Sequence, residues 1–493
     1  MCLSVLTVLF LVGVLTLICY LNAINVWNKR TQQNFPPGPR PLPVIGNLHI
    51  MNLKRPYKTL LKLSEKYGSV FSIQLGMKKM VVLTGYETVK EALVNHADEF
   101  GERARVPIFQ RFSKGLGIIF SHGENCKVMR RFTITTLRDF GMGKRTIEEK
   151  IIEECGFLIR HFESFTGTPF DTSVIMNTSI ANIIAAIVQG HRFDYLDPAF
   201  LRFLRLITES DGLLESPMVA LYNIFPIFGL FPGSHKTILK HVIEVNASIK
   251  STLMECLKQL DANDQRNFID VFLAKQKEEK SNLTYFNEEN LINIVQNLFA
   301  AGMGTTASTL RWSLLLMMKY PEIQEKVQEE IERVIGSSQP RIEHRKQMPY
   351  TDAVIHEIQR FADVVPMNLP HETTTDTNFR GYFIPKGTLI IPLLTSVLKD
   401  KTQFENPEEF NPQHFLDSDG KFVKKDAFMP FSAGRRICIG ETLAKMELFI
   451  FFTSLLQKFT FHPPPGVTDL DLTPVSGITT PPMPHLICAQ PRS

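Results

Sequence analysis

The chain has 493 residues, of which 44% are hydrophobic and 21% are charged, a composition typical of a globular protein and not of a disordered one. Lysine and arginine exceed aspartate and glutamate by only four (54 − 50), and no nucleic-acid-binding motif is present, so the sequence argues against a nucleic-acid partner. The seven cysteines are odd in number and include no CxxC pair, so they do not indicate a disulfide framework.

The first predicted element is a membrane-spanning helix at the N-terminus. Residues 3–22, LSVLTVLFLVGVLTLICYLN, are apolar over a length that crosses a bilayer, and no charged side chain precedes Lys29. A cleaved signal peptide would show a basic start and a small-residue cleavage site, and neither is evident. Lys29 and Arg30 follow the span, which favours a cytosolic body. Residues 1–28 are therefore predicted to be an uncleaved single-pass anchor.

A basic and proline-rich segment, residues 29–47, follows the anchor. Five prolines lie between Pro36 and Pro43, so this stretch cannot be helical and is expected to be stiff and extended. We interpret it as a hinge that holds the remaining body, residues 48–493, at a set distance from the membrane.

The body is predicted to be one large, mainly α domain with a small β portion. Residues 69–75 and 78–84 alternate like strands and flank Gly76-Met77, which predicts a hairpin. Residues 381–394, GYFIPKGTLIIPLL, predict a second hairpin with its turn at residues 385–387. Most of the remaining sequence is typical of helices of 10 to 20 residues separated by proline, glycine and asparagine.

The longest predicted helix covers residues 287–320 and ends against Pro321. Its centre, FAAGMGTTAST at residues 299–309, contains two glycines and three threonines, which are poor residues for a helix interior. One explanation is close packing against a neighbouring helix. The other is that a flat, rigid group approaches the backbone there, with hydroxyl groups within reach.

A cysteine-containing loop near the C-terminus carries the strongest chemical signal. Cys438 lies between Gly434 and Gly440, follows two arginines and precedes an amphipathic helix. The glycines let the backbone curve closely around the sulfur. Cationic neighbours and a helix start both favour a thiolate. The alternative is a buried, unreactive cysteine.

The loop matches the pattern F-x-x-G-x-R-x-C-x-G at Phe431, Gly434, Arg436, Cys438 and Gly440. It closely resembles the haem-binding loop of the cytochrome P450 family, whose cysteine thiolate is the proximal ligand of the haem iron. The anchor and the PPGP hinge resemble the vertebrate microsomal family-two group, so the resemblance covers nearly the whole chain. It implies the P450 fold, haem b bound by residues 48–493, and an endoplasmic reticulum membrane location.

The resemblance also assigns a structural motif to Glu357 and Arg360, the E-x-x-R pair. At i, i+3 on a helix the two side chains can meet, although such a pair is more often an exposed salt bridge. In the family the pair is buried and locks its helix to the loop before the cysteine. His414 in NPQHF stands where many relatives have arginine, and histidine also occurs there in the family-two group.

Haem carries two propionates, which need cationic donors. The resemblance implies Arg130, Arg436, His371 and Arg103 for this role, whereas each taken alone could be an ordinary exposed basic residue. Cys126 occupies the tryptophan position of W-x-x-x-R, so the usual indole donor is absent and haem retention is in question.

The family pattern A-G-x-[D/E]-T-[T/S] fits the central helix at Ala301, Gly302, Thr305 and Thr306. The resemblance implies that these small residues keep the helix close to haem. The Thr305 hydroxyl would then hydrogen-bond dioxygen and help to deliver protons. Gly304 occupies the acidic position, so the usual carboxylate of this proton relay is absent.

Nine mostly apolar residues are implied as substrate contacts, which suits hydrophobic small molecules such as drugs, fatty acids or steroids. Each of them could instead belong to the core. They are Ile108, Phe109, Ile119, Phe120, Phe299, Ala300, Val365, Met367 and Ile478.

Basic residues around the cysteine side could form an ordinary solvated face or a docking surface for acidic electron donors. The resemblance implies NADPH–cytochrome P450 reductase as partner, with cytochrome b5 as a second donor. The basic residues are Lys127, Arg131, Arg138, Lys144, Arg145, Arg435 and Lys445.

The leading functional hypothesis is a haem-thiolate monooxygenase that uses dioxygen and NADPH-derived electrons on lipophilic small molecules. Two alternatives remain because Gly304 and Cys126 depart from the family motifs. One is a haem-thiolate isomerase or dehydratase that acts on a peroxide. The other is a catalytically impaired haem protein that only binds lipophilic ligands.

Overall fold

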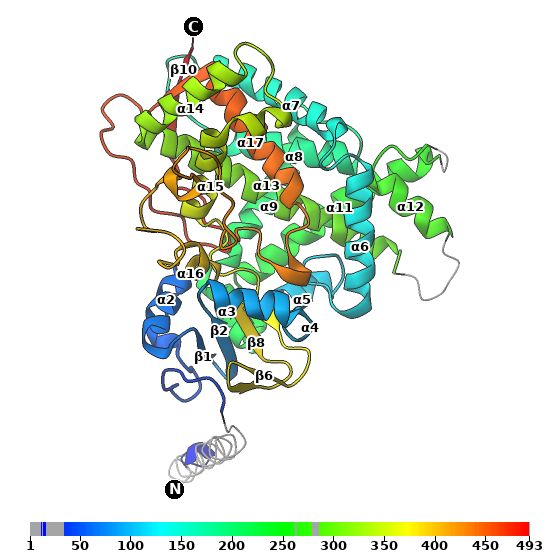
Figure 1. Cartoon of the computed structure of the whole chain (residues 1–493). Coiled ribbons are helices and arrows are strands. Elements are labelled where there is room, and N and C mark those ends of the chain that lie inside the picture. The colour runs from blue at the N-terminus through cyan, green and yellow to red at the C-terminus, as the bar shows by residue number, and fades with distance from the viewer. Residues whose placement is uncertain (1–10, 12, 16–33, 262–263, 279–284, 493) are drawn as a thin grey trace.

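The computed structural model describes residues 11, 13–15, 34–261, 264–278 and 285–492. These residues form a large helical part and a smaller part built on β-strands, which contains the described N-terminal segment (Figure 1). The prediction of a mainly α fold with a small β portion is confirmed. The helices are α2 (Pro56–Tyr67), α3 (Tyr86–Lys90), α4 (Ala97–Phe100), α5 (Pro107–Ser113), α6 (Gly123–Asp139), α7 (Arg145–Glu163), α8 (Ser173–Val188), α9 (Pro198–Leu214), α10 (Pro217–Ile224), α11 (Ser234–Gln259), α12 (Phe268–Glu278), α13 (Glu288–Lys319), α14 (Pro321–Val334), α15 (Pro349–Ala362), α16 (Leu394–Leu398) and α17 (Glu441–Lys458).

The strands form a five-stranded sheet in the order β1-β2-β8-β5-β3, a three-stranded sheet in the order β4-β10-β9, and the hairpin β6-β7. In the larger sheet β2 and β8 are parallel and the other pairs are antiparallel. The strands are β1 (Val70–Leu75), β2 (Lys78–Leu83), β3 (Glu102–Arg103), β4 (Phe170–Asp171), β5 (His371–Glu372), β6 (Thr377–Phe379), β7 (Tyr382–Ile384), β8 (Leu389–Pro392), β9 (Phe459–His462) and β10 (Leu486–Pro491).

The first predicted hairpin is confirmed, and the second is wrong. Strands β1 and β2 pair directly across Gly76-Met77. By contrast, β7 pairs with the preceding β6 and not with β8. The two-residue turn at Arg380 and Gly381 has positive φ at both positions, the geometry that joins neighbouring antiparallel strands. The apolar strand β8 instead enters the interior of the larger sheet, where it lies between β2 and β5.

The long central helix is confirmed as α13. The Asn287 side chain accepts a hydrogen bond from the backbone N–H of Asn290 and caps the first turn, and the helix ends before Pro321. Helix α13 runs through the helical part and contacts α8, α9, α11, α15 and α17 (Figure 1). At 26 residues, α11 is longer than the 10 to 20 residues predicted for the other helices.

The proline-rich segment, from residue 34 onwards, contains no helix before Leu48. Its backbone follows the edge of β1, where the Ser72 N–H donates to the Pro37 carbonyl oxygen over 2.7 Å. The predicted anchor lies almost entirely outside the described residues. Within the described part of the chain, no helix has the length and apolar character needed to cross a membrane.

Candidate functional site

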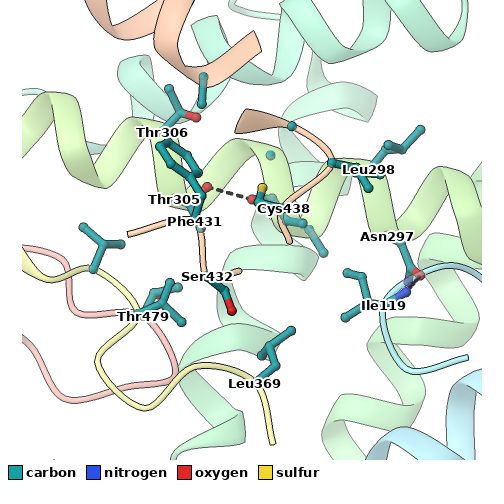
Figure 2. A pocket seen from close by; sticks show the side chains of 18 of the residues that line it. Ile119, Asn297, Leu298, Thr305, Thr306, Leu369, Phe431, Ser432, Cys438 and Thr479 are labelled. Carbon is teal, nitrogen blue, oxygen red and sulfur yellow. Dashed lines mark hydrogen bonds between the residues drawn. The ribbon is translucent and has the colours of Figure 1, made fainter. Parts of the chain in front are cut away.

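A cavity of about 390 Å³ lies at the centre of the helical part and collects most of the predicted site residues. Helix α13 contributes Ala301, Gly302, Thr305 and Thr306 to its wall, and the loop before α17 contributes Cys438. Figure 2 shows Thr305 and Cys438 at this same cavity, although they lie far apart in the sequence. The lining is otherwise mostly apolar, so the cavity suits a hydrophobic molecule.

The loop that carries Cys438 is held by its backbone. The Cys438 N–H donates to the Phe431 carbonyl oxygen over 3.0 Å, and Gly434 has φ +71°. A Cβ atom at Gly434 would collide with the backbone of Leu93, which explains why this position has no side chain. Gly440 ends the loop, and α17 starts at the next residue. The loop thus presents the sulfur to the cavity.

The surroundings of Cys438 shift the pKa of its thiol in both directions. Its side chain is exposed to the cavity but shielded by protein from bulk solvent. Burial raises the pKa of the Cys438 thiol above its ordinary value, and the Gly440 N–H and Arg130 offset this rise only in part. Cationic neighbours and the helix start therefore do not by themselves produce a thiolate. A metal cation deprotonates a coordinating thiol outright, so metal coordination would supply the missing stabilisation.

Three arginines converge on the cavity wall near this loop. Arg103 and Arg436 are buried, and both they and Arg130 line the cavity. Burial, together with repulsion by Arg436 and Arg130, lowers the pKa of Arg103 to about 9. The Arg103 Nε and Arg436 Nη1 atoms are buried and have no hydrogen-bond partner among the described residues. Such a cluster fits an anionic group, and the two carboxylates of haem meet this requirement.

His371 does not act as the predicted cationic donor. The antiparallel register of β3 and β5 places it opposite Arg103. Its Nδ1–H donates to the Phe100 carbonyl oxygen over 2.6 Å, and its Nε2 accepts from Arg103 Nη1 over 2.5 Å. Burial, followed by repulsion from Arg103, lowers the pKa of His371 well below its ordinary value. The histidine is therefore neutral and positions Arg103.

One of the two departures from the family motifs lies close to these arginines. Cys126 is buried on α6, near Arg103 and Arg130. It adds no N–H donor at the place of the missing indole. Arg130 itself donates from Nη2 to the Ile437 carbonyl oxygen over 2.8 Å, which ties α6 to the cysteine loop.

The weak centre of α13 has more than one cause. A Cβ atom at Gly302 would lie 2.8 Å from the end of the Ile184 side chain on α8, so close helix packing explains this glycine in part. Gly302 also lines the cavity, as the second explanation requires. The Thr305 hydroxyl donates to the Ala301 carbonyl oxygen over 2.8 Å, a bond within α13 that leaves its oxygen free to accept.

Glu357 and Arg360 form a buried, two-pronged ion pair on α15. Their side chains are 0% exposed, and both nitrogen–oxygen distances, Nε–Oε2 and Nη2–Oε1, are 2.7 Å. His414 also contacts Glu357, with 3.1 Å between Nδ1 and Oε2. The predicted contact is therefore present, and the exposed alternative is wrong. Arg360 also donates to backbone carbonyls of the segment that leads towards the cysteine loop.

Six of the nine predicted substrate contacts line the cavity, namely Phe109, Ile119, Phe120, Ala300, Val365 and Ile478. Ile108, Phe299 and Met367 do not, and for these three the prediction is wrong. Phe299 points to the other side of α13, where its ring meets the Phe203 ring of α9 edge-on with centroids 5.0 Å apart. Ile108 is fully buried in a separate core cluster, and Met367 packs against the cluster around Phe71.

The predicted basic surface is partly neutralised. Four of its seven residues form ion pairs with acids, in the pairs Lys127–Glu124, Arg145–Glu149, Arg435–Asp98 and Lys445–Glu441. Arg131, Arg138 and Lys144 are exposed and form no ion pair within the described part of the chain. These three carry the unbalanced positive charge of the surface.

Sequence reasoning missed four carboxyl groups in the cavity wall, one of which, Asp363, directly follows α15. Glu447 lies on α17, while Asp211 and Glu215 lie at the C-terminal end of α9. An acid within the apolar run MELFIFF is a signal that could have revealed Glu447. Nothing in TESDGLLES distinguishes Asp211 and Glu215 from surface acids, because only the packing of α9 on α13 brings them inward.

Burial raises the pKa of Glu447 to about 8, and the neighbouring Thr306 hydroxyl offsets this rise in part. The unfolded chain releases this proton at the ordinary pKa of a glutamate, near 4.5. Between these two values the folded protein holds a proton that the unfolded chain has lost. The free energy of unfolding contributed by this group therefore falls as the pH rises through this window.

Replacing Glu447 with glutamine is expected to stabilise the protein, and more so at pH 8 than at pH 5. Glutamine keeps the shape of the side chain but has no proton to lose, so the pH-dependent loss of stability disappears. Urea unfolding midpoints at the two pH values test this, with Glu343→Gln, at an exposed glutamate, as the control. An equal effect of Glu447→Gln at both pH values would contradict the raised pKa.

A family model described as "Cytochrome P450" matches residues 36–489 of this chain. Among similar proteins, Cytochrome P450 2K1 of Oncorhynchus mykiss is 51% identical over 491 residues, which cover 99% of this chain and 96% of that protein. Cytochrome P450 2F2 of Mus musculus is 49% identical, with coverage of 93% and 94%. Cytochrome P450 2C5 of Oryctolagus cuniculus is 48% identical, with coverage of 96% and 98%.

Proposed function

This chain belongs to the cytochrome P450 family and is a P450 monooxygenase, and we propose that it inserts one oxygen atom of dioxygen into lipophilic small molecules. The single observation that carries the proposal is the cavity in which Cys438, three arginines and Thr305 meet an apolar lining. The family implies a haem-thiolate iron cofactor, and the arginine cluster suits its carboxylates. Drugs, fatty acids and steroids all fit the chemistry of this lining.

In this proposal each residue of the cavity has a defined task. Cys438 would hold the haem iron through its sulfur, and Arg103, Arg130 and Arg436 would hold the propionates, with His371 positioning Arg103. Phe431, Gly434 and Gly440 shape the loop around the group. Haem supplies the iron centre that activates dioxygen when electrons reach it.

The residues that α13 contributes to the cavity wall have a separate task. Ala301 and Gly302 are small, so they leave room for a small molecule next to α13. Thr306 lies beside them on the same helix. The Thr305 hydroxyl orients dioxygen and helps to deliver protons to it, as a general acid that acts through water. The six apolar contacts named above exclude bulk water and position the substrate.

We also propose that electrons come from NADPH through NADPH–cytochrome P450 reductase, with cytochrome b5 as a second donor. The exposed cations Arg131, Arg138 and Lys144 support an acidic partner on this face. In this proposal residues 1–28 anchor the chain in the endoplasmic reticulum membrane, residues 29–47 form the hinge, and residues 48–493 form the cytosolic catalytic domain.

Reconstitution with haem, reductase and NADPH tests the proposed function. A panel of lipophilic compounds is incubated while NADPH, hydrogen peroxide and product are followed together. We expect product in proportion to NADPH for at least one compound. Turnover of organic hydroperoxides without NADPH, and no product with it, would favour the isomerase or dehydratase. NADPH consumed only to form hydrogen peroxide would favour the impaired ligand-binding protein.

A further inference from the structure

The position opposite Gly304 is taken by a carboxyl group from another helix. A Cβ atom built on Gly304 would have Asp211 Oδ2 as its neighbour, at 4.0 Å. Asp211 belongs to α9, which packs against α13. An acidic side chain at residue 304 would therefore bring a second carboxylate next to Asp211, where like charges repel. Glycine at residue 304 therefore leaves Asp211 without a second carboxyl group beside it.

The Asp211 carboxyl is available for chemistry in the cavity. It lines the same cavity as Thr305, and it forms no hydrogen bond or ion pair with any residue that the structure describes. Burial raises the pKa of Asp211 to about 7, so about half of the molecules hold this proton at neutral pH. A structural carboxylate at such a place would be expected to have a cationic or hydrogen-bonding partner.

The other carboxyl groups of the cavity are placed differently. Glu447 lies beside Thr306, and Asp363 interacts with Thr395 and Lys399. Glu215 lies against the backbone at Gly477, away from residue 304. Asp211 is therefore the carboxyl that faces the part of α13 next to Thr305.

We propose that Asp211 replaces the acid that is absent at Gly304 and delivers protons through cavity water to Thr305 Oγ1. This inference rests on the proposed monooxygenase activity, which consumes protons because it reduces one atom of dioxygen to water. It places the acid of the proton relay on α9 and the hydroxyl on α13, instead of both on one helix.

The transfer balances without any change in electron count. The O–H bond of Asp211 breaks and its proton joins a cavity water, which gives up one of its own protons to Thr305 Oγ1. Thr305 in turn gives its hydroxyl proton, which is bonded to the Ala301 carbonyl oxygen in the resting structure, to the oxygen atom that the proposed reaction reduces to water. The Asp211 carboxylate then regains a proton from solvent water.

A double-mutant cycle between residues 211 and 304 tests the replacement. The variants are Asp211→Asn, Gly304→Glu and the two combined, and the readout is product formed per NADPH in protein with equal haem content. Asp211→Asn is expected to lower this ratio at least about tenfold, which is less than the roughly hundredfold low end of general acid contributions. In the Gly304→Glu background the same change is expected to alter it less than about twofold, because the introduced glutamate supplies the acid again.

Glu215→Gln provides the matched control, because Glu215 is a cavity acid one helical turn away. Its charge interacts with that of Asp211, so Glu215→Gln should change the ratio, but less than Asp211→Asn does. An unchanged ratio in Asp211→Asn, or an equal loss in both backgrounds, would overturn the proposal.

Infrared difference spectroscopy gives a second readout that needs no turnover. At pH 7 the difference between wild type and Asp211→Asn should contain the band of a protonated carboxyl group. Absence of this band would overturn the proposal, because Asp211 would then hold no proton to give. If wild type makes no product at all, the proposed function fails, while the infrared result still decides the protonation of Asp211.

Discussion

Arg360→Ala is expected to destabilise the folded protein severely. The substitution leaves the Glu357 carboxylate, which is 0% exposed, without its arginine partner. Removing one member of a buried ion pair costs about 3–5 kcal/mol, a large part of the roughly 5–15 kcal/mol by which proteins are stable. Urea unfolding measures the loss. Arg131→Ala, at an exposed cation, is the control, expected to stay within about 0.5 kcal/mol.

The loss should exceed the ion pair alone, because Arg360 also ties three backbone carbonyls together. It donates to the carbonyl oxygens of Leu398 at 3.1 Å, Pro407 at 2.7 Å and Glu409 at 2.8 Å. A double variant with leucine at residues 357 and 360 removes both charges but still leaves these carbonyls without donors. It should remain clearly less stable than wild type. Wild-type stability in either variant would contradict the structural role of the pair.

Motifs with a fixed spacing could be found from the sequence because they fold locally. The loop around Cys438 depends on a glycine with positive φ and a helix start within a few residues, and both are visible in FSAGRRICIGE. The pair on α15 was likewise predictable, since i, i+3 side chains meet on any helix. Its burial was not, because that depends on the distant segment that covers it.

The failures came from positions whose surroundings are set by tertiary contacts. Strands β7 and β8 are separated by a plausible turn, yet β8 pairs with β2, a strand about 300 residues earlier in the chain. Phe299 and Ala300 are neighbours in sequence, but they face opposite sides of α13. Asp211 reaches the cavity only because α9 packs on α13. No local pattern carries this information.

His371 and Cys438 show the same limit for electrostatics. Their residue types are plain from the sequence, but the charge of each depends on burial and on the nearest hydrogen-bond partners. For His371 these partners are a backbone carbonyl and an arginine, which together fix the neutral ring. For Cys438, burial raises the pKa of the thiol more than the nearby Arg130 lowers it. The thiol therefore has to bind a metal ion to become a thiolate.

The largest functional effect is expected for Cys438→Ser, which should abolish monooxygenase activity. Serine keeps the size of the side chain and the backbone bond to Phe431, but its hydroxyl oxygen is a far weaker donor to iron than a thiolate sulfur. Cys256→Ser, at a cysteine on α11 away from the cavity, is the matched control and should retain activity.

The reduced, carbon monoxide-treated absorption spectrum of these proteins tests the central claim most directly. We expect wild type and Cys256→Ser to show the red-shifted Soret band of a thiolate-bound haem, and Cys438→Ser to lack it. A Cys438→Ser protein that still shows this band would mean that another residue binds the iron, and the assignment of the cavity would be wrong.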